Sequence, residues 1–294
     1  MADLMINVVR RYRYETLKRE DLPEGRRYVN RHGEALPSVT TILEKTKDKS
    51  KLIEWVNRVG EEEAERVRTS AANVGTSMHA FIESHIKNRP ITPAKYLWQA
   101  KAYRMAAGLM EQYFGDLDEV WGNEVMVYRR GLYAGTTDLA GKFRGQDSIV
   151  DFKQTNKMKK REWIEDYFVQ LVAYASAHNE MYNTRIRQGV ILMASQDGQF
   201  QDFILCGREF DHYLDLWNTK VADTVGGGGV VPQSPAETGE QTQNTEPRSA
   251  EQAFSEDSEQ VQTELEMGSE QEQQPETAPV EQPEEFEAWL REQK

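Results

Sequence analysis

The stretch from residue 133 to 153, YAGTTDLAGKFRGQDSIVDFK, is the feature that most limits how this chain can fold. It reads as two strands joined by a tight polar turn, with Asp138 in the first strand and Asp151 in the second. Side chains alternate between the two faces of a strand, so Asp151 and Lys153 point the same way. If the two strands pair, Asp138 can lie beside Asp151. The pattern therefore favours a sheet that brings two carboxylates and an ammonium group together.

Such a group suits a divalent cation, because carboxylate oxygens are hard ligands that Mg²⁺ or Mn²⁺ accepts. One or two ions would lower the pKa of a bound water, hold a scissile phosphate and offset charge on the leaving oxygen. Lys153 would orient the water or stabilise the charge that develops on the phosphate. The alternative is a surface hairpin with scattered charges. Asp is depleted from strand interiors, so two aspartates within strands argue against this alternative. The residues thus indicate metal-dependent hydrolysis of a phosphodiester.

Two pairs of residues at helical spacing extend this group. His79 and Glu83 are four residues apart in GTSMHAFIES, and Gln170 and Tyr174 are four apart in DYFVQLVAYASA. Residues at this spacing share one face of a helix. Taken alone, the first pair can be a solvated surface pair and the second a helix edge lying on a sheet. The order along the chain is His, Glu, Asp, Asp-x-Lys and Gln-x-x-x-Tyr, which chance produces less readily than any one part.

In this order the chain resembles the PD-(D/E)XK nuclease superfamily, and within it the RecB-type exonuclease branch of the mitochondrial genome maintenance and phage exonucleases. The matching stretches are PSVTTIL (37–43), GTSMHAFIE (75–83), YAGTTDLAG (133–141), VDFK (150–153) and QLVAYASAHN (170–179). The resemblance implies a restriction-endonuclease-like α/β core, a central mixed sheet flanked by helices. It also implies a Mg²⁺- or Mn²⁺-dependent exonuclease that acts on free ends of DNA, with a preference for single strands.

The resemblance assigns a role to each matching residue. Asp138 and Asp151 would bind the metal together with His79, the histidine typical of this branch, and Lys153 would be the active-site lysine. Gln170 and Tyr174 would shape the site and contact DNA, with Glu83 in a supporting role. The chain departs from the family at Gln154, where a small hydroxyl residue is usual. It also lacks the cysteine quartet of some relatives, so no iron–sulfur cluster is expected.

DNA contacts are expected in the basic segment NKMKKREW (156–163), directly after the second acidic strand. Lysine and arginine side chains there would contact DNA phosphates, and aromatic rings nearby would stack on bases of a single strand. A solvated basic loop is the alternative, because charge runs often mark only exposure. The candidate residues are Lys157, Lys159, Lys160, Arg161, Trp163 and Tyr167.

The formal charge of −13 is unevenly distributed. Residues 226–294 hold 17 acidic and 3 basic residues, whereas residues 1–225 hold 32 acidic and 33 basic ones. The first part is therefore close to neutral, and the acidity of the chain does not argue against a polyanionic partner there. A lone cysteine, Cys206, excludes a disulfide framework and an all-cysteine metal site within one chain and fits a reducing compartment.

The order of patterns predicts one mixed α/β domain over residues 1–225. A hairpin and helices fill residues 1–117, and residues 118–225 form the catalytic core. From the helix expected near 94–114 onward, the order is helix, three strands, helix, two strands, helix. Helices are expected near 50–70, 74–87, 94–114, 162–182 and 209–225, with strands at 119–128, 132–143, 148–153, 187–195 and 200–206. No apolar run approaches membrane-spanning length, and we expect a cytoplasmic protein of a bacterium or a phage-infected cell.

Residues 226–282 are rich in Glu, Gln, Ser, Thr and Pro, which predicts a disordered acidic linker. Residues 283–294 differ, because Phe286, Trp289 and Leu290 form a small apolar face at helical spacing. This tail motif would dock on a replication or recombination protein. Two other readings stay open: a tail that only raises solubility, and an acidic tail that imitates DNA.

Three hypotheses follow for the whole chain. The first is a metal-dependent DNA exonuclease in replication, recombination or repair. The second is a structure-specific endonuclease built on the same site. The third is a non-catalytic module that binds DNA and recruits partners, against which the complete Asp138, Asp151 and Lys153 set argues.

Overall fold

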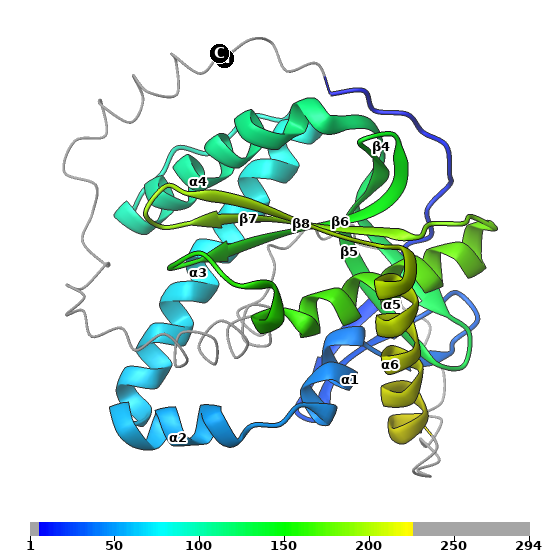
Figure 1. The fold of residues 1–294 in the computed structure, drawn as a ribbon, viewed down its shortest axis with the longest axis horizontal. Helices are drawn as coiled ribbons and strands as arrows, with labels where there is room; N and C mark the ends of the chain where they lie inside the picture. Colours follow the sequence, from blue (N-terminus) through cyan, green and yellow to red (C-terminus); the bar gives the residue numbers. More distant parts are fainter. Residues whose placement is uncertain (1–5, 226–294) are drawn as a thin grey trace, which may run out of the picture.

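The computed structural model describes residues 6–225, and a five-stranded mixed sheet forms its centre (Figure 1). The strand order follows the sequence, with antiparallel neighbours except for the parallel pair β6 and β7. The strands are β4 (Leu117–Arg129), β5 (Tyr133–Phe143), β6 (Gln146–Thr155), β7 (Gln188–Ser195) and β8 (Phe200–Cys206).

The parallel pair requires a crossover, because two parallel strands cannot be joined by a tight turn. The 3-10 turn η2 (Arg161–Trp163) and the helix α5 (Glu165–Tyr182) provide it. Strand β7 has neighbours on both edges and helices over both faces, and each of its residues is buried. Its run of apolar residues, VILMA, is what such a position demands.

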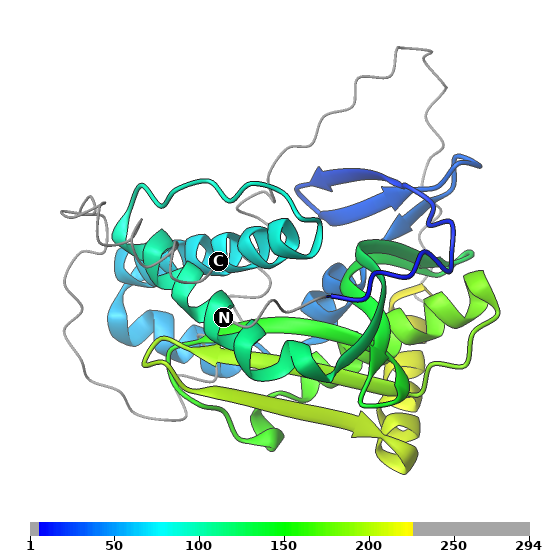
Figure 2. The same cartoon turned by 90° about the horizontal axis from the view of Figure 1, so that it is seen from above.

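Helices cover both faces of the sheet (Figures 1 and 2). On one face α5 packs with α1 (Val39–Thr46) and α6 (Gly207–Val225) around Phe168 and the fully buried Trp217. On the other face Met78, Leu109 and Phe152 belong to a second apolar cluster. This cluster joins α3 (Glu61–Ile86), α4 (Leu97–Tyr113) and the 3-10 turn η1 (Phe114–Asp116) to the sheet.

A second, three-stranded sheet lies before the first helix, with strands β1 (Lys18–Leu22), β2 (Gly25–Val29) and β3 (Ala35–Pro37). The expected N-terminal hairpin is therefore present as β1 and β2, and β3 adds a third strand. Helix α1 begins directly after Ser38, which caps it: the Ser38 side chain accepts a hydrogen bond from the backbone N–H of Thr41 at 2.9 Å.

The predicted order of elements from α4 to α6 is confirmed, as is a mixed sheet flanked by helices. The boundary between the helices expected at 50–70 and 74–87 is wrong. Helix α2 (Ser50–Val59) ends at Gly60, which has a φ of 91°, and α3 then runs without a break to Ile86. Gly75 lies inside α3, and a Cβ there would lie at an ordinary van der Waals distance of 3.8 Å from Gln154 Cγ.

The linker predicted for residues 226–282 and the motif of Phe286, Trp289 and Leu290 lie outside the described residues. Among helices within 6–225, none is long and apolar enough to cross a membrane.

Candidate active site

The site forms where β5 and β6 separate. Their antiparallel pairing runs from Phe143–Gln146 to Leu139–Val150 and stops there, one residue short of Asp138 and Asp151. Beyond this point β5 continues along β4, whereas β6 continues along β7. The backbone N–H of Phe152 then lacks a strand partner and donates instead to Asp138 Oδ2 at 2.8 Å. The fork thus fixes the Asp138 carboxylate against β6, where the hairpin pattern predicted it.

Lys153 and Asp151 form a buried ion pair on the face of β6 that meets α5. Lys153 Nζ lies 3.0 Å from Asp151 Oδ2, and the two residues are 2% and 3% exposed. The ammonium also lies 4.9 Å from the ring centre of Tyr167 on α5, in cation–π geometry. Removing both charges from water is costly, and their mutual attraction offsets that cost. The predicted shared orientation of Asp151 and Lys153 is confirmed.

His79 reaches Asp138 from α3, on the other side of the fork. It is 5% exposed, its Nδ1 lies 3.4 Å from Asp138 Oδ1, and its ring packs edge-on against Phe152 with centroids 6.2 Å apart. The structure therefore brings together His79 and Asp138, two of the three predicted metal ligands. The third, Asp151, lies on β6, the other strand of the fork. Glu83, one helical turn further along α3, instead forms an ion pair with Lys87.

Glu124 of β4 joins this group and was not identified from the sequence. Its carboxylate, the His79 imidazole and the Asp138 carboxylate each offer a ligand atom, and these atoms lie within 4.8 Å of one another. Glu124 stands across from Asp138, between the register pairs Asn123–Leu139 and Val125–Thr137. It has a φ of 53°, which is uncommon for a residue other than glycine.

Gln170 and Tyr174 meet on the inner face of α5, as the helical spacing predicted. Gln170 Nε2 donates to the Tyr174 hydroxyl at 3.1 Å. Burial, aided by the nearby Asp151 carboxylate, holds the pKa of Tyr174 well above its usual range, so the hydroxyl keeps its proton. Gly135 makes room for this ring, because a Cβ there would lie 2.5 Å from Tyr174 Cε1.

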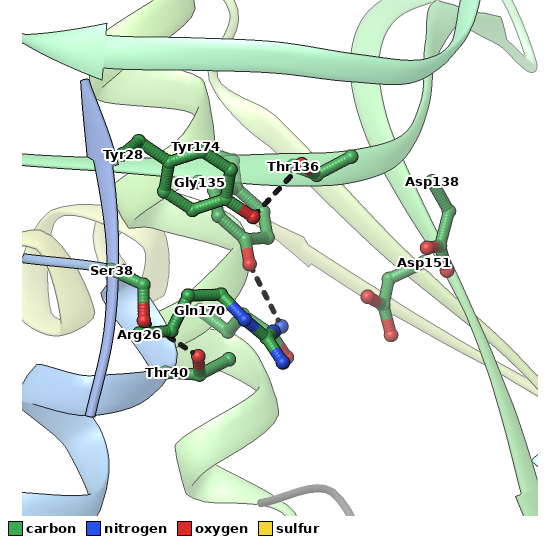
Figure 3. A pocket seen from close by; sticks show the side chains of 10 residues that line it. All are labelled: Arg26, Tyr28, Ser38, Thr40, Gly135, Thr136, Asp138, Asp151, Gln170 and Tyr174. Atoms are coloured by element: carbon green, nitrogen blue, oxygen red, sulfur yellow. Dashed lines mark hydrogen bonds between the residues drawn. The ribbon is translucent and has the colours of Figure 1, made fainter. Parts of the chain in front are cut away.

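These residues line a narrow recess that the N-terminal sheet closes on one side (Figure 3). The side chain of Arg26 on β2 extends beside Gln170, facing Asp138 and Asp151 across the recess. Tyr28, also on β2, bonds Thr136 through its hydroxyl at 3.1 Å. Ser38 and Thr40 at the start of α1 complete the wall. Sequence reasoning missed Arg26 because the hairpin that carries it lies more than 100 residues before Asp138.

The residues predicted to contact DNA have different surroundings. Lys157 and Lys160 are exposed, and Lys160 Nζ lies 5.1 Å from the ring centre of the half-buried Trp163. Lys159 is buried, at 3% exposure. Arg161 is held by Glu209 at 2.6 Å and by the Ile204 carbonyl at 2.9 Å. Tyr167 is buried beneath Lys153.

The donor set fits a hard divalent cation. The carboxylates of Asp138 and Glu124 supply oxygen ligands, and the His79 imidazole adds a nitrogen ligand. The Asp151 carboxylate lines the same recess as Asp138. His79, Asp138 and Asp151 are buried and Glu124 is half-buried, which limits contact with bulk water and strengthens electrostatic interactions inside the site.

Comparison with known proteins points to one named relative. The chain is 27% identical over 199 residues to mitochondrial genome maintenance exonuclease 1 of Mus musculus, with 61% of this chain and 57% of the mouse protein covered. The match thus spans little more than half of that relative. Among solved structures, the chain is similar to a candidate exonuclease from Eubacterium rectale, with a TM-score of 0.39, 13% identity and coverage of 53% of this chain and 65% of that chain. No protein-family model matches the chain.

Proposed function

We propose that this protein is a Mg²⁺- or Mn²⁺-dependent deoxyribonuclease of the PD-(D/E)XK type, RecB branch, which hydrolyses single-stranded DNA from free ends. The observation that carries the proposal is the Lys153–Asp151 pair at 3.0 Å, beside the clustered ligand atoms of His79, Glu124 and Asp138. The similarity to a named exonuclease agrees with it.

Each residue then has a defined task. Asp138, Asp151, Glu124 and His79 would hold the cation, which supplies an activated water and a Lewis acid for the phosphate. The Lys153 ammonium, fixed between Asp151 and the Tyr167 ring, would lie ready to stabilise negative charge on the phosphate oxygens. The protonated Tyr174 hydroxyl and the Gln170 amide offer neutral hydrogen bonds beside it.

Degradation of end-labelled single-stranded DNA with Mg²⁺ or Mn²⁺ tests this function directly. We expect cleavage that chelation abolishes and that Asp151→Asn and Lys153→Ala each reduce by about 100-fold or more. Arg187→Ala is the control, since it breaks a surface ion pair with Asp211 far along the sheet from the fork. Equal cleavage by the parent protein and Asp151→Asn would rule out the assignment.

A second substrate separates the kinds of nuclease. A covalently closed single-stranded circle has no ends, so an exonuclease leaves it intact. Nicking of the circle would favour a structure-specific endonuclease instead. DNA binding with no cleavage of either substrate under any divalent metal would favour a non-catalytic module. A recruiting role for the segment with Phe286, Trp289 and Leu290 in replication or recombination stays a separate proposal.

A further inference from the structure

The recess beside the catalytic carboxylates is lined by a positively charged side chain. Arg26 lies at its wall and is 8% exposed, and Asp138 and Asp151 lie on the opposite side (Figure 3). The other groups that line this wall are neutral, namely the Ser38 and Thr40 hydroxyls and the Gln170 amide. A buried guanidinium that faces a recess with neutral hydrogen-bonding groups around it suits an anion.

The ion-pair partner of Arg26, Asp21, is shared with a second guanidinium. Its Nε donates to Asp21 at 2.8 Å, and Asp21 and Arg26 are paired across the β1–β2 hairpin. The same carboxylate also accepts from Arg19 at 2.9 Å. Two guanidinium groups therefore share the Asp21 carboxylate, which cannot neutralise both of them. Because Nε makes the bond to Asp21, the two terminal nitrogens of the planar guanidinium are the atoms that reach furthest into the recess.

The size of the recess limits what can enter it. It is narrow, with room for about one water-sized group. A base or a sugar ring is too large, whereas one unesterified oxygen of a phosphate group fits. A cation bound to the neighbouring carboxylates would hold the scissile phosphate of the same strand.

We propose that Arg26 holds a second phosphate group of the DNA strand, adjacent to the scissile one. This inference rests on the proposed function and adds a substrate contact to it. Two fixed points along one strand would set which linkage lies at the metal. The phosphate is either an internal diester or a terminal monoester, since both present the same oxygen to the guanidinium.

Binding measurements with Ca²⁺ in place of Mg²⁺ test the site without requiring cleavage. The probes are short fluorescent single strands, either fully charged or carrying one methylphosphonate at successive positions, which removes a charged oxygen. Further strands carry or lack a phosphate at each end. The variant is Arg26→Gln. Its matched control is Arg27→Gln, which breaks the other cross-strand ion pair, with Glu20 at 2.7 Å, but does not line the recess.

We expect Arg26→Gln to bind the charged strand about tenfold more weakly than the parent protein, with a salt dependence that falls by about 0.7 in slope, the value for one phosphate contact on a single strand. In the parent protein, a methylphosphonate at one position should weaken binding by a similar factor, or a phosphate at one end should strengthen it by that factor. Neither change should alter binding by Arg26→Gln. The position at which this occurs identifies the source of the phosphate. Arg27→Gln should behave as the parent.

The inference is overturned if Arg26→Gln binds as tightly as the parent, or if it keeps the parent's response at every substituted position. Asp21→Asn separates folding from binding, because it removes the hairpin ion pair and keeps the guanidinium. If Asp21→Asn loses binding as much as Arg26→Gln does, the role of Arg26 is structural and the inference fails. A protein that cleaves DNA yet shows no Arg26 effect rejects only this inference, whereas one that shows the Arg26 effect but never cleaves rejects only the nuclease.

Discussion

The carboxylates of Glu124 and Asp138 meet across the β4–β5 ladder, with ligand atoms within 4.8 Å of each other and of the His79 imidazole. Strand neighbours of like charge destabilise a sheet unless something lies between them. A cation shared by the two carboxylates removes this repulsion. Glu124 also keeps a left-handed backbone conformation, which costs free energy that bound metal would help offset.

Replacement of Glu124 by Gln should therefore weaken metal binding, because it removes one negative ligand and keeps the shape. We expect at least a tenfold rise in the Mn²⁺ dissociation constant by calorimetry. Glu111→Gln, at an exposed position on α4, is the control and should bind Mn²⁺ as the parent does. Unchanged affinity in Glu124→Gln would exclude Glu124 from the metal site.

The ion pair between Lys153 and Asp151 predicts a stability effect that metal reverses. Lys153→Ala leaves the Asp151 carboxylate buried without its 3.0 Å partner, which should cost about 3 kcal/mol of unfolding free energy in chelator. Urea denaturation measures this cost. Mn²⁺ should restore much of it, because the cation supplies the missing positive charge. The exposed neighbour Lys157, changed to Ala, should lose little stability with or without Mn²⁺. A loss that Mn²⁺ does not diminish would contradict the prediction.

The contact between Gly135 and Tyr174 predicts a steric effect on the site. A Cβ at position 135 would lie 2.5 Å from the Tyr174 ring, so Gly135→Ala must displace that ring and its bond with Gln170. We expect about 1–3 kcal/mol of destabilisation and a marked fall in cleavage rate. Gly75→Ala is the matched control, since its Cβ meets only Gln154 Cγ at an ordinary 3.8 Å within a helix. Equal effects of the two substitutions would show that the ring contact is unimportant.

Local patterns in the sequence were sufficient to predict the fold and part of the candidate site. Alternation along a strand was enough to orient Asp151 and Lys153, and helical spacing was enough to join Gln170 to Tyr174. Glu124 was missed because its neighbours match the pattern of an ordinary strand, and the sequence gives no sign of its left-handed backbone conformation. An acid next to the apolar run VMV within β4 was the available signal.

Contacts between distant segments could not be predicted in the same way. Arg26 reaches the recess because the β1–β2 hairpin packs beside β5, which no local pattern encodes. The basic run after β6 illustrates the opposite case, in which a local pattern overstates exposure. Lys159 and Tyr167 fold inward, and Arg161 is held by Glu209, so a count of charges did not reveal which side chains face solvent.

His178 on α5 predicts how stability depends on pH, away from the catalytic groups. The ring is fully buried, bonded to the Tyr14 hydroxyl at 3.1 Å and to Thr184 Oγ1 at 2.8 Å. Burial lowers the pKa of His178 to about 4, from 6.5 for a free imidazole. The folded state thus holds the ring neutral, while the unfolded chain takes up a proton below pH 6.5. Stability from this residue is complete above pH 6.5 and is lost as the pH falls toward 4.

Urea denaturation of the parent and of His178→Gln between pH 7.5 and pH 4.5 checks this prediction. Acidic groups elsewhere also titrate in this range, so the informative quantity is the difference in unfolding free energy between the two proteins. The parent should be the more stable at pH 7.5, because its ring fills the site and makes both hydrogen bonds. That advantage should shrink with acidity, by up to about 3 kcal/mol, since a proton bound only in the unfolded state favours unfolding. An advantage that stays constant over the whole range would mean that His178 binds its proton equally well in both states.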